Sequence, residues 1–295
     1  MNKGYKSGFA AIVGMPNVGK STLLNTIAGQ KIAIISEKPQ TTRNKILAVH
    51  TGKSEQIVFI DTPGMHTPHN KLGEFMVNDA NESMSDVDVV LLVVDATRKI
   101  QGLEREIPKN AEKSGVPCIL VINKVDEVPK ENLLPMIADY ASMYDFESIV
   151  PISAKTGDGV NILINDICEC LPEGPQFYES ETVTDQPERQ IAAEIIREKM
   201  LWLLDKEVPH GIAIEITKMQ EKENITNIYA TIFCEKATHK GIIIGKGGEM
   251  LKKIGTMARG DIEKMLEKKV YLELWVKVKT DWRNNDTLIK NFGYN

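Results

Sequence analysis

The amino-acid sequence predicts two domains: an α/β domain with a mostly parallel sheet and helices on both faces, followed by a smaller α+β domain. Through the first half, apolar runs of strand length alternate with helix-compatible stretches, the pattern of a sheet covered on both faces. The pattern stops near Pro172, and residues 178–189 are polar, acidic and without periodicity. A chain of 295 residues can hold two hydrophobic cores. We expect a first domain over 1–175, a linker over 176–187, a second domain over 188–280 and a tail over 281–295.

The first domain is predicted to contain six strands. A short polar turn at residues 51–54 joins the second and third strands, so these two are expected to form a hairpin at the edge of the sheet. Ligands of such sheets bind at the carboxyl ends of the strands, so motifs that directly follow a strand are candidates for the site. The predicted strands span residues 10–13, 45–50, 57–60, 87–94, 117–122 and 149–152.

The second domain is predicted from periodicity that begins again after the linker. Apolar residues at helical spacing indicate a helix near 188–204, and a short apolar helix that ends in a glycine loop precedes a long helix over 249–268. Alternating residues predict three strands, near 211–219, 226–235 and 270–279.

Composition is that of an ordinary globular protein. The net charge is −5, with 17 basic and 25 acidic residues before position 187 and 19 basic and 16 acidic residues from there on. A mildly basic second half suits binding to a polyanion. The four cysteines, at positions 118, 168, 170 and 234, form no Cys-x-x-Cys pair and are expected to be buried thiols. Without an apolar run of membrane-spanning length or a secretory pattern at the N-terminus, a cytoplasmic protein is expected.

The segment from Gly14 to Ser21 has the spacing of a phosphate-binding loop, Gly-x-x-x-x-Gly-Lys-Ser, between a strand and a helix. Glycines at both ends let backbone N–H groups turn toward the phosphates, and the helix N-terminus favours an anion. Lys20 supplies a cation at the terminal phosphates, and the Ser21 hydroxyl is a ligand for Mg²⁺. The residues predicted to contact the phosphates are Asn17, Val18, Gly19, Lys20, Ser21, Thr22 and, further along, Gly64.

A second motif, Asp-Thr-Pro-Gly at residues 61–64, directly follows the third strand. Asp61 is expected to hold Mg²⁺ through a water, and the Gly64 N–H to reach the γ-phosphate. Between this motif and the phosphate loop, Thr42 is preferred over Thr41 as the hydroxyl that closes over Mg²⁺ in the triphosphate state, unless the segment is a plain polar loop. The predicted switch residues are Thr41, Thr42, Asp61, Thr62, Pro63, Gly64 and Met65.

The motif Asn-Lys-Val-Asp at residues 123–126 follows the fifth strand and predicts which base is bound. The Asp126 carboxylate can accept from both the N1–H and the N2–H₂ of guanine, whereas adenine offers no such donor pair. Asn123 and Lys124 are expected to brace the loop and cover the base, and residues 153–155 (Ser153, Ala154 and Lys155) to complete the pocket, with the Ala154 N–H at the guanine carbonyl. Together these motifs resemble the translation-factor class of P-loop GTPases over residues 8–172.

Two positions in this GTPase pattern bear on hydrolysis. Where Ras-like GTPases carry a glutamine that orients the attacking water, this chain has Met65, so slow intrinsic hydrolysis is expected. His66 is a candidate base, although a histidine in a loop is more often solvated. Asn17 is similar to the asparagine with which several GTPases that lack the glutamine hold K⁺, which makes it a candidate K⁺ ligand.

The glycine loop of the second half resembles the Gly-x-x-Gly loop of a type II KH domain, which clamps a single-stranded nucleic-acid backbone between two helices. A helix cap followed by a flexible turn would have the same Gly-x-x-Gly pattern. The predicted flanking helices and the final strand favour a KH domain instead. Of the tryptophans, Trp282 in the polar tail is the candidate for base contact, whereas Trp202 and Trp275 are expected in the core. Residues 242–244 are expected to form the apolar wall of the groove. The predicted RNA-binding residues are Ile243, Ile244, Gly245, Lys246, Gly247, Gly248, Lys252 and Lys253.

A GTPase domain followed by one type II KH domain, with Pro-Gln-Thr-Thr-Arg at residues 39–43 and Asp-Thr-Pro-Gly after it, resembles the bacterial Era family. The resemblance implies a monomeric GTPase that binds 16S ribosomal RNA near its 3′ end and assists processing and assembly of the 30S subunit. It also implies partial peripheral association with the inner face of the cell membrane. Two alternatives stay open from the residues: a tRNA-directed GTPase, and an RNA-binding protein whose nucleotide site is mainly regulatory.

Overall fold

A computed structural model describes residues 4–36, 38, 41–43, 45–62, 70–82, 87–100 and 102–294. The chain packs into two compact units. The first consists of Met1–Ala33, Thr42–Thr67 and Phe75–Asp185. The second consists of Gln186–Asn295 together with two short segments from earlier in the chain, Ile34–Thr41 and Pro68–Glu74.

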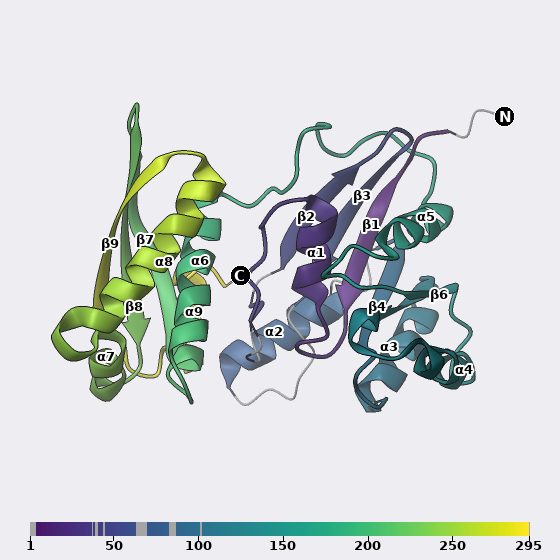
Figure 1. The fold of residues 1–295 in the computed structure, drawn as a ribbon, viewed down its shortest axis with the longest axis horizontal. Coiled ribbons are helices and arrows are strands. Elements are labelled where there is room, and N and C mark those ends of the chain that lie inside the picture. Colours follow the sequence, from purple (N-terminus) through teal and green to yellow (C-terminus); the bar gives the residue numbers. More distant parts are fainter. Residues whose placement is uncertain are drawn as a thin grey trace. The chain divides into compact units, whose positions relative to one another are not determined.

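The first unit is built on a six-stranded sheet in the order β2-β3-β1-β4-β5-β6 (Figure 1). Only β2 is antiparallel to its neighbour, and the turn to β3 is closed by the Gly52 N–H donating to the Glu55 carbonyl at 2.8 Å. The predicted edge hairpin and parallel sheet are therefore confirmed. The strands are β1 (Lys6–Val13), β2 (Ile46–Thr51), β3 (Glu55–Asp61), β4 (Val89–Asp95), β5 (Cys118–Asn123) and β6 (Ser148–Pro151).

Helices cover both faces of this sheet because successive side chains of its central strands point to opposite sides. In β1, Ala10 and Ile12 pack in one core with Leu23 of α1, whereas Ala11 and Val13 pack in a second core with residues of α3. The α5 helix joins the first core and α4 the second. The helices are α1 (Lys20–Ala28), α2 (Lys71–Glu82), α3 (Gly102–Lys113), α4 (Leu133–Ala141) and α5 (Val160–Cys170).

The second unit has the predicted order of helix, two strands, two helices and a strand. Its sheet runs β7-β8-β9, with β7 antiparallel and β9 parallel to β8. Residues of α6 and α8 pack with one face of the sheet in a single core. The elements are α6 (Glu188–Leu203), β7 (Ile212–Glu221), β8 (Ile225–Cys234), α7 (Ala237–Ile244), α8 (Glu249–Leu266) and β9 (Lys269–Val278).

The tail contradicts one prediction, because it folds onto the second unit as a short turn (Trp282–Asn284) and a helix, α9 (Asp286–Asn291). The Trp282 side chain is fully buried, and its indole N–H donates to the Gly211 carbonyl at 3.0 Å. Its ring packs edge-on against Phe292 and stacks with Tyr294. Trp282 is therefore a core residue and not a contact for bases. The polar residues around it in the sequence concealed this role.

The other two tryptophans were also predicted wrongly. Trp202, at the end of α6, is 49% exposed and Trp275, on β9, is 60% exposed. Trp275 lies at an outward position of the strand, and its indole N–H donates to Glu273 two residues away at 2.7 Å. In a strand, residues at i and i+2 share one face, so this contact places both side chains on the same surface.

The four cysteines are free thiols. Cys118 and Cys234 are buried as expected, whereas Cys168 and Cys170 are only half-buried, so that prediction was wrong for these two. Burial raises the pKa of Cys118 to about 12 and that of both Cys168 and Cys170 to about 11. Burial also raises the pKa of Cys234. Among the helices of the described residues, none has the length and apolar character needed to cross a membrane.

Candidate functional site

The phosphate loop lies between the end of β1 and the start of α1. Its two outer glycines are required by close neighbours: a Cβ on Gly14 would lie 2.3 Å from the Val93 carbonyl oxygen, and one on Gly19 2.1 Å from the Asn123 amide nitrogen. The backbone at Gly19 is left-handed, with φ of 100°. A side chain at either position would push the loop away from β4 or β5, so the spacing seen in the sequence has a direct packing cause.

The first turn of α1 faces the loop without competition from acidic side chains. Gly19 is the N-cap residue and contributes no side chain, and residues Lys20–Leu23 include no acid. The Leu23 N–H donates to the Gly19 carbonyl at 2.9 Å. The N–H groups of Ser21 and Thr22 have no carbonyl one turn earlier in the helix and carry the positive end of the helix dipole. An anion at this helix terminus satisfies both conditions.

The Lys20 side chain is held across the loop. Its Nζ donates to the Gly14 and Met15 carbonyls, both at 3.0 Å. Burial lowers the pKa of Lys20 to about 8, although the nearby Asp61 carboxylate opposes this shift. A bound phosphate would favour the charged form in the same way, so Lys20 is placed to respond to an anion on the loop.

Three oxygen-bearing side chains meet beside the phosphate loop. The Ser21 hydroxyl donates to Asp61 Oδ2 at 2.9 Å and lies 2.9 Å from the Thr42 hydroxyl, which itself lies 3.4 Å from Asp61 Oδ2. Asp61 is buried, and its Oδ1 atom has no hydrogen-bond partner among the described residues. An orphaned carboxylate oxygen beside two hydroxyls is a set of hard oxygen donors, which fits Mg²⁺.

Burial raises the pKa of Asp61 to about 6, while Lys20 and the hydrogen bonds from Ser21 and Thr42 work in the opposite direction. A raised pKa means that the surroundings of the buried carboxylate do not fully stabilise its negative charge. A divalent cation beside it would stabilise that charge. The electrostatics of the cluster thus agree with its donor set.

The two adjacent threonines have different roles. The Thr41 hydroxyl donates to the Lys38 carbonyl at 2.6 Å and to the Ser36 carbonyl at 3.3 Å, so it is used within its own segment. Thr42 instead lies in the cluster with Asp61, as expected for the hydroxyl that closes over the metal. The Thr62 hydroxyl donates to the Ile12 carbonyl at 2.9 Å, which ties the end of β3 to β1.

The remaining predicted switch residues, Pro63, Gly64 and Met65, lie outside the described residues, as does His66. Gly64 at the γ-phosphate, the effect of Met65 on the attacking water and the role of His66 therefore stay predictions. Asn17 lies within the described loop and has a left-handed backbone, with φ of 66°.

Asn123 joins the phosphate loop to the predicted base pocket. Its amide nitrogen donates to the Val18 carbonyl at 2.8 Å, and its Oδ1 accepts the Ala154 N–H at 2.9 Å. The bracing role expected of Asn123 therefore has a geometric basis. Because the Ala154 N–H is already paired, a guanine carbonyl would have to share this donor with Asn123.

Lys124 is fixed by a residue that the motif analysis missed. Its Nζ donates to Asp95 Oδ2 at 2.6 Å, and Arg98 lies 3.2 Å from the same oxygen. Burial alone would raise the pKa of Asp95, but the hydrogen bonds from Lys124 and Thr97 outweigh it and hold the pKa below its ordinary value. The position of Asp95 at the end of β4, beside the strand that carries the motif, was the signal available in the sequence.

The side chains left for the base itself are exposed or lie on the surrounding loop. Asp126 and Lys155 are exposed. The Ser153 hydroxyl accepts the Thr156 N–H at 3.2 Å, which shapes the loop around Ala154. The phosphate loop, Asp61 and both base-pocket segments thus all lie at carboxyl ends of strands, where this class of sheet binds its ligands.

In the second unit, the predicted glycine loop connects α7 to α8. Gly245, Gly247 and Gly248 all have positive φ, at 73°, 61° and 85°. A Cβ on Gly245 would lie 2.8 Å from the Met250 Cβ, whereas Gly247 and Gly248 have no neighbour within 4 Å of such an atom. The loop therefore offers bare backbone beside the N-terminus of a long helix, as phosphodiester binding requires.

The side chains around this loop agree with the prediction in most positions. Lys246 in the loop and Lys252 and Lys253 in α8 are exposed, and Ile244 is half-buried. Ile243 is fully buried in the core and cannot wall a groove, so its assignment to RNA binding was wrong. Successive residues of a helix point about 100° apart, and it is Ile242, 50% exposed, that faces outward.

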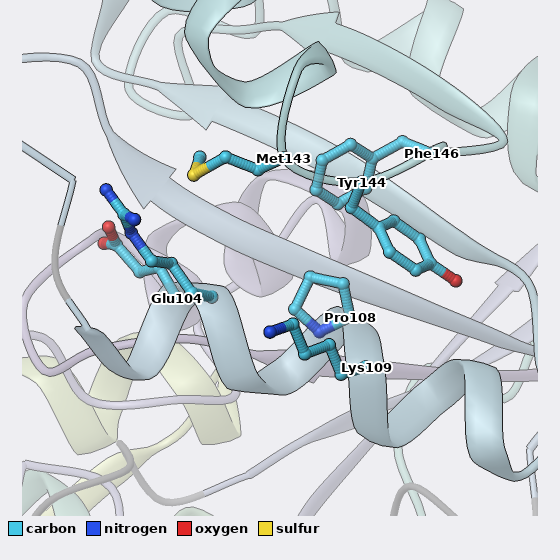
Figure 2. Close-up of a pocket in the computed structure, with 7 residues that line it drawn as sticks. Glu104, Pro108, Lys109, Met143, Tyr144 and Phe146 are labelled. Atoms are coloured by element: carbon cyan, nitrogen blue, oxygen red, sulfur yellow. The ribbon is translucent and has the colours of Figure 1, made fainter.

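A separate hollow of about 240 Å³ lies in the first unit, between α3 and the segment that follows α4 (Figure 2). Pro108 and Lys109 of α3 and the Tyr144 and Phe146 rings are among the side chains that line it. The two rings pack edge-on, with centroids 5.0 Å apart. It contains none of the predicted nucleotide-site or RNA-site residues.

Together, a phosphate loop, an oxygen cluster for Mg²⁺ and a guanine motif on one sheet, followed by a helix–glycine-loop–helix unit, define a P-loop GTPase joined to a KH domain. Residues 9–124 match a family described as 50S ribosome-binding GTPase, and residues 207–283 match the KH domain family. The chain belongs to the Era family of GTPases, because it is 53% identical over 98% of its length to the GTPase Era of Ruminiclostridium cellulolyticum, of which it also covers 98%.

Further relatives agree with this assignment. The GTPase Era of Clostridium acetobutylicum is 51% identical, with 98% of each chain covered. A variant of Aquifex aeolicus Era, bound to GDP and AlF₄⁻, superposes with a TM-score of 0.94 at 42% identity, covering 98% of this chain and 99% of that one. An Era in complex with MgGDPNP and nucleotides 1506–1542 of 16S ribosomal RNA superposes with a TM-score of 0.95, at the same identity and coverage.

Proposed function

We propose that this GTPase binds Mg²⁺ with GTP in its first unit and 16S ribosomal RNA through the glycine loop of its second unit. On this proposal it assists processing and assembly of the 30S subunit. The observation that carries the nucleotide half is the meeting of Ser21, Thr42 and Asp61 in one oxygen cluster beside the phosphate loop. The exposed glycine backbone with flanking lysines supports the RNA half, as does the relative found in complex with 16S ribosomal RNA.

In the proposed nucleotide site each residue has a separate task. Lys20 binds the terminal phosphates, while N–H groups of the loop and of the first turn of α1 bind the others. Ser21 and Thr42 would hold Mg²⁺ directly and Asp61 through a water, and the ion would neutralise charge on the phosphate oxygens. Thr42 belongs to a segment that must move when the terminal phosphate leaves, so its hydroxyl links hydrolysis to a change in that segment.

Asp126 selects the base in this proposal. Its exposed carboxylate accepts both guanine donors, while Asn123 and Lys124 hold the loop through Val18 and Asp95. An adenine base would leave the carboxylate without these donors, which disfavours ATP. The site is therefore arranged for guanine nucleotides.

A turnover assay with GTP, Mg²⁺ and the full chain tests the nucleotide half. We expect slow hydrolysis in the wild type and its loss in Lys20→Ala, with ATP turned over much more slowly than GTP. Equal turnover of both nucleotides would contradict the assignment of Asp126.

The RNA half has its own test. Crosslinking in cells followed by sequencing of the bound RNA should recover the 3′ region of 16S ribosomal RNA. Enrichment of tRNA would favour the alternative of a tRNA-directed GTPase. Bound 16S RNA without measurable GTP turnover would favour the alternative in which the nucleotide site is mainly regulatory.

K⁺ is proposed as a second cation, held by Asn17, because Met65 replaces the glutamine that orients water in Ras-like GTPases. The left-handed backbone at Asn17 offers a competing reason for the residue, since asparagine and glycine both accept this conformation. The test is therefore Asn17→Gly, which keeps the backbone and removes the amide oxygen. Wild-type turnover should be faster in K⁺ than in Na⁺, and the variant should show no difference. Equal wild-type rates in the two salts would rule the proposal out.

Cytoplasmic localisation, a monomeric state and partial association with the inner face of the membrane are proposed from the family resemblance. Fractionation of cells and sedimentation of the purified chain test these three statements. Recovery of the protein only as a dimer, or its complete absence from membrane fractions, would contradict the corresponding part.

A further inference from the structure

The segment Ile34–Thr41, which immediately precedes Thr42, is held by side chains of α6. The Ile35 N–H donates to Glu198 Oε1 at 2.9 Å, and the Ile35 carbonyl accepts the Trp202 indole N–H, also at 2.9 Å. Arg197 donates to the Thr41 carbonyl. Side chains of α6 thus bind the N–H and the carbonyl of Ile35 and the carbonyl of Thr41.

Other contacts reinforce this arrangement. Lys38 of the segment donates to the Leu204 carbonyl just after α6. Lys199 Nζ lies 2.7 Å from Glu198 Oε2 and 3.8 Å from the centre of the Trp202 ring, and it also bonds Asp261 of α8. The ion pairs and the ring contact hold the side chains of Glu198 and Trp202 in the positions from which they reach Ile35.

The charged members of this group are unusually well buried. The Arg197, Glu198 and Lys199 side chains are each no more than 2% exposed. Buried charges of this kind are costly unless they are paired and hydrogen-bonded. Arg197 pairs with Glu194 and also donates to the Thr41 carbonyl, and Glu198 pairs with Lys199 and also accepts the Ile35 N–H. The proposed GTP and RNA sites use none of these three residues.

We propose that Trp202 and Glu198 of α6, with Arg197, are positioning residues for Thr42. The 34–41 segment ends at Thr41, whose carbonyl is one peptide bond from Thr42, and in the same structure the Thr42 hydroxyl lies in the cluster with Ser21 and Asp61. By fixing Ile35 and Thr41, α6 reduces the number of conformations from which Thr42 must close when a triphosphate and Mg²⁺ are bound. The residues act on nucleotide binding through Thr42 and touch neither nucleotide nor metal. This inference rests on the proposed role of Thr42 in the GTP site.

The closing experiment compares nucleotide affinities of the full chain. Trp202→Phe removes the indole N–H that holds the Ile35 carbonyl and leaves a smaller ring for Lys199 to contact. Lys38→Met removes the contact made from the segment side. Because Thr42 is needed for the triphosphate and not for GDP, each variant should bind GDPNP with Mg²⁺ about threefold to tenfold more weakly, the range for one lost hydrogen bond, and bind GDP unchanged. The double variant should show a larger loss than either single one.

Trp275→Phe is the matched control, since Trp275 is also an exposed tryptophan but donates its indole N–H within its own strand. It should bind both nucleotides as the wild type does. Equal loss of GDPNP and GDP affinity in Trp202→Phe, or no loss of either, would overturn the inference. A thermal melt of each variant separates these results from unfolding. If the wild type itself bound neither nucleotide, the proposed GTP site would fail instead.

Discussion

At the scale of single residues, Asp126 is the side chain on which base selection depends. It is exposed in the structure, while its neighbours Asn123 and Lys124 are fixed by other contacts. We predict that Asp126→Asn lowers affinity for GTP by about a hundredfold, because the amide cannot accept both guanine donors. Affinity for xanthosine triphosphate should rise, since an amide N–H can donate to the additional carbonyl of xanthine. Competition binding with the two nucleotides measures both effects, and unchanged preference for GTP would remove Asp126 from this role.

Asp95 accepts a hydrogen bond from Lys124 of the base motif, and its charge makes a pH-dependent contribution to stability. The lowered pKa means that the native state favours the ionised carboxylate. The stabilisation is therefore present above the ordinary pKa of 3.8 and is lost as pH falls through the lowered value. We predict that Asp95→Asn reduces the free energy of unfolding by about 1 kcal/mol at pH 7, because the Lys124 partner is partly exposed.

The difference between wild type and Asp95→Asn should shrink as pH falls below 3.8 and through the lowered pKa of native Asp95, because the protonated carboxyl is then uncharged like the amide that replaces it. Urea unfolding at pH 7 and at acidic pH measures it. Asp88→Asn is a suitable control, because Asp88 accepts the Phe9 N–H at 2.7 Å at the other end of the same sheet. A difference between wild type and Asp95→Asn that stayed constant with pH would show that the Lys124 contact does not depend on the charge.

At the scale of elements, the glycines of the loop between α7 and α8 differ in how closely other atoms approach them. Gly245 has a tight neighbour in Met250, so a substitution there disturbs folding. Gly248 has open space around it, so a side chain fits there, although its φ of 85° adds some backbone strain. We predict that Gly248→Asp weakens RNA binding by at least about tenfold through charge repulsion with the phosphodiester backbone, while GTP affinity persists. Filter binding with a 16S 3′-end oligonucleotide and a GTP titration measure the two quantities.

Gly260→Asp provides the control for this loop substitution. It introduces the same charge in α8, at a helical position without a close neighbour and three turns from the loop. RNA binding should be retained there. Loss of RNA and GTP binding together in Gly248→Asp would point to misfolding instead of a local effect on the RNA site.

The same loop shows what the sequence could and could not predict. The strands and helices follow from periodicity, and the glycines from spacing, because both are local patterns. Ile243 was misplaced since three successive isoleucines give no local indication of which one faces the core. Trp282 was misplaced since its partners Gly211, Phe292 and Tyr294 come together only when the tail packs on the sheet. Long-range packing of this kind leaves no short-range signature.

The nucleotide site was more predictable than its supports. Ser21, Asp61 and Asn123 each follow a strand or begin a helix, so their placement follows from the order of elements. The choice of Thr42 over Thr41 agrees with the contacts of the two hydroxyls. The roles of Asp95 and of Arg197, Glu198 and Trp202 depend on contacts between segments 29 to 167 positions apart, which no motif encodes.

At the scale of the whole molecule, a segment that precedes Thr42 packs in the unit that is proposed to bind RNA. Linkage requires that any effect of nucleotide on RNA affinity be matched by an equal effect of RNA on nucleotide affinity. We predict that GDPNP and GDP give RNA affinities that differ by about tenfold in the wild type, within the usual range of such couplings. In Trp202→Phe, the RNA affinities measured with GDPNP and with GDP should become nearly equal.

Six titrations measure this coupling: RNA affinity with GDPNP and with GDP, and the affinity of each of the two nucleotides with and without RNA. The control is again Trp275→Phe, in which the wild-type ratio should persist. A ratio of one in the wild type would mean that the two units bind their ligands independently, whatever the packing of the 34–41 segment.

The native thiols react slowly enough that dyes on introduced cysteines can be used to follow a response of the two units to nucleotide by fluorescence. With pKa values of about 11 to 12 for Cys118, Cys168 and Cys170, only about one thiol in ten thousand or fewer is thiolate at neutral pH. Maleimide dyes therefore react first with a cysteine introduced at an exposed position. A pair such as Lys113→Cys and Arg259→Cys would carry one dye on each unit, and energy transfer between the dyes would follow nucleotide exchange in real time without removal of any native cysteine.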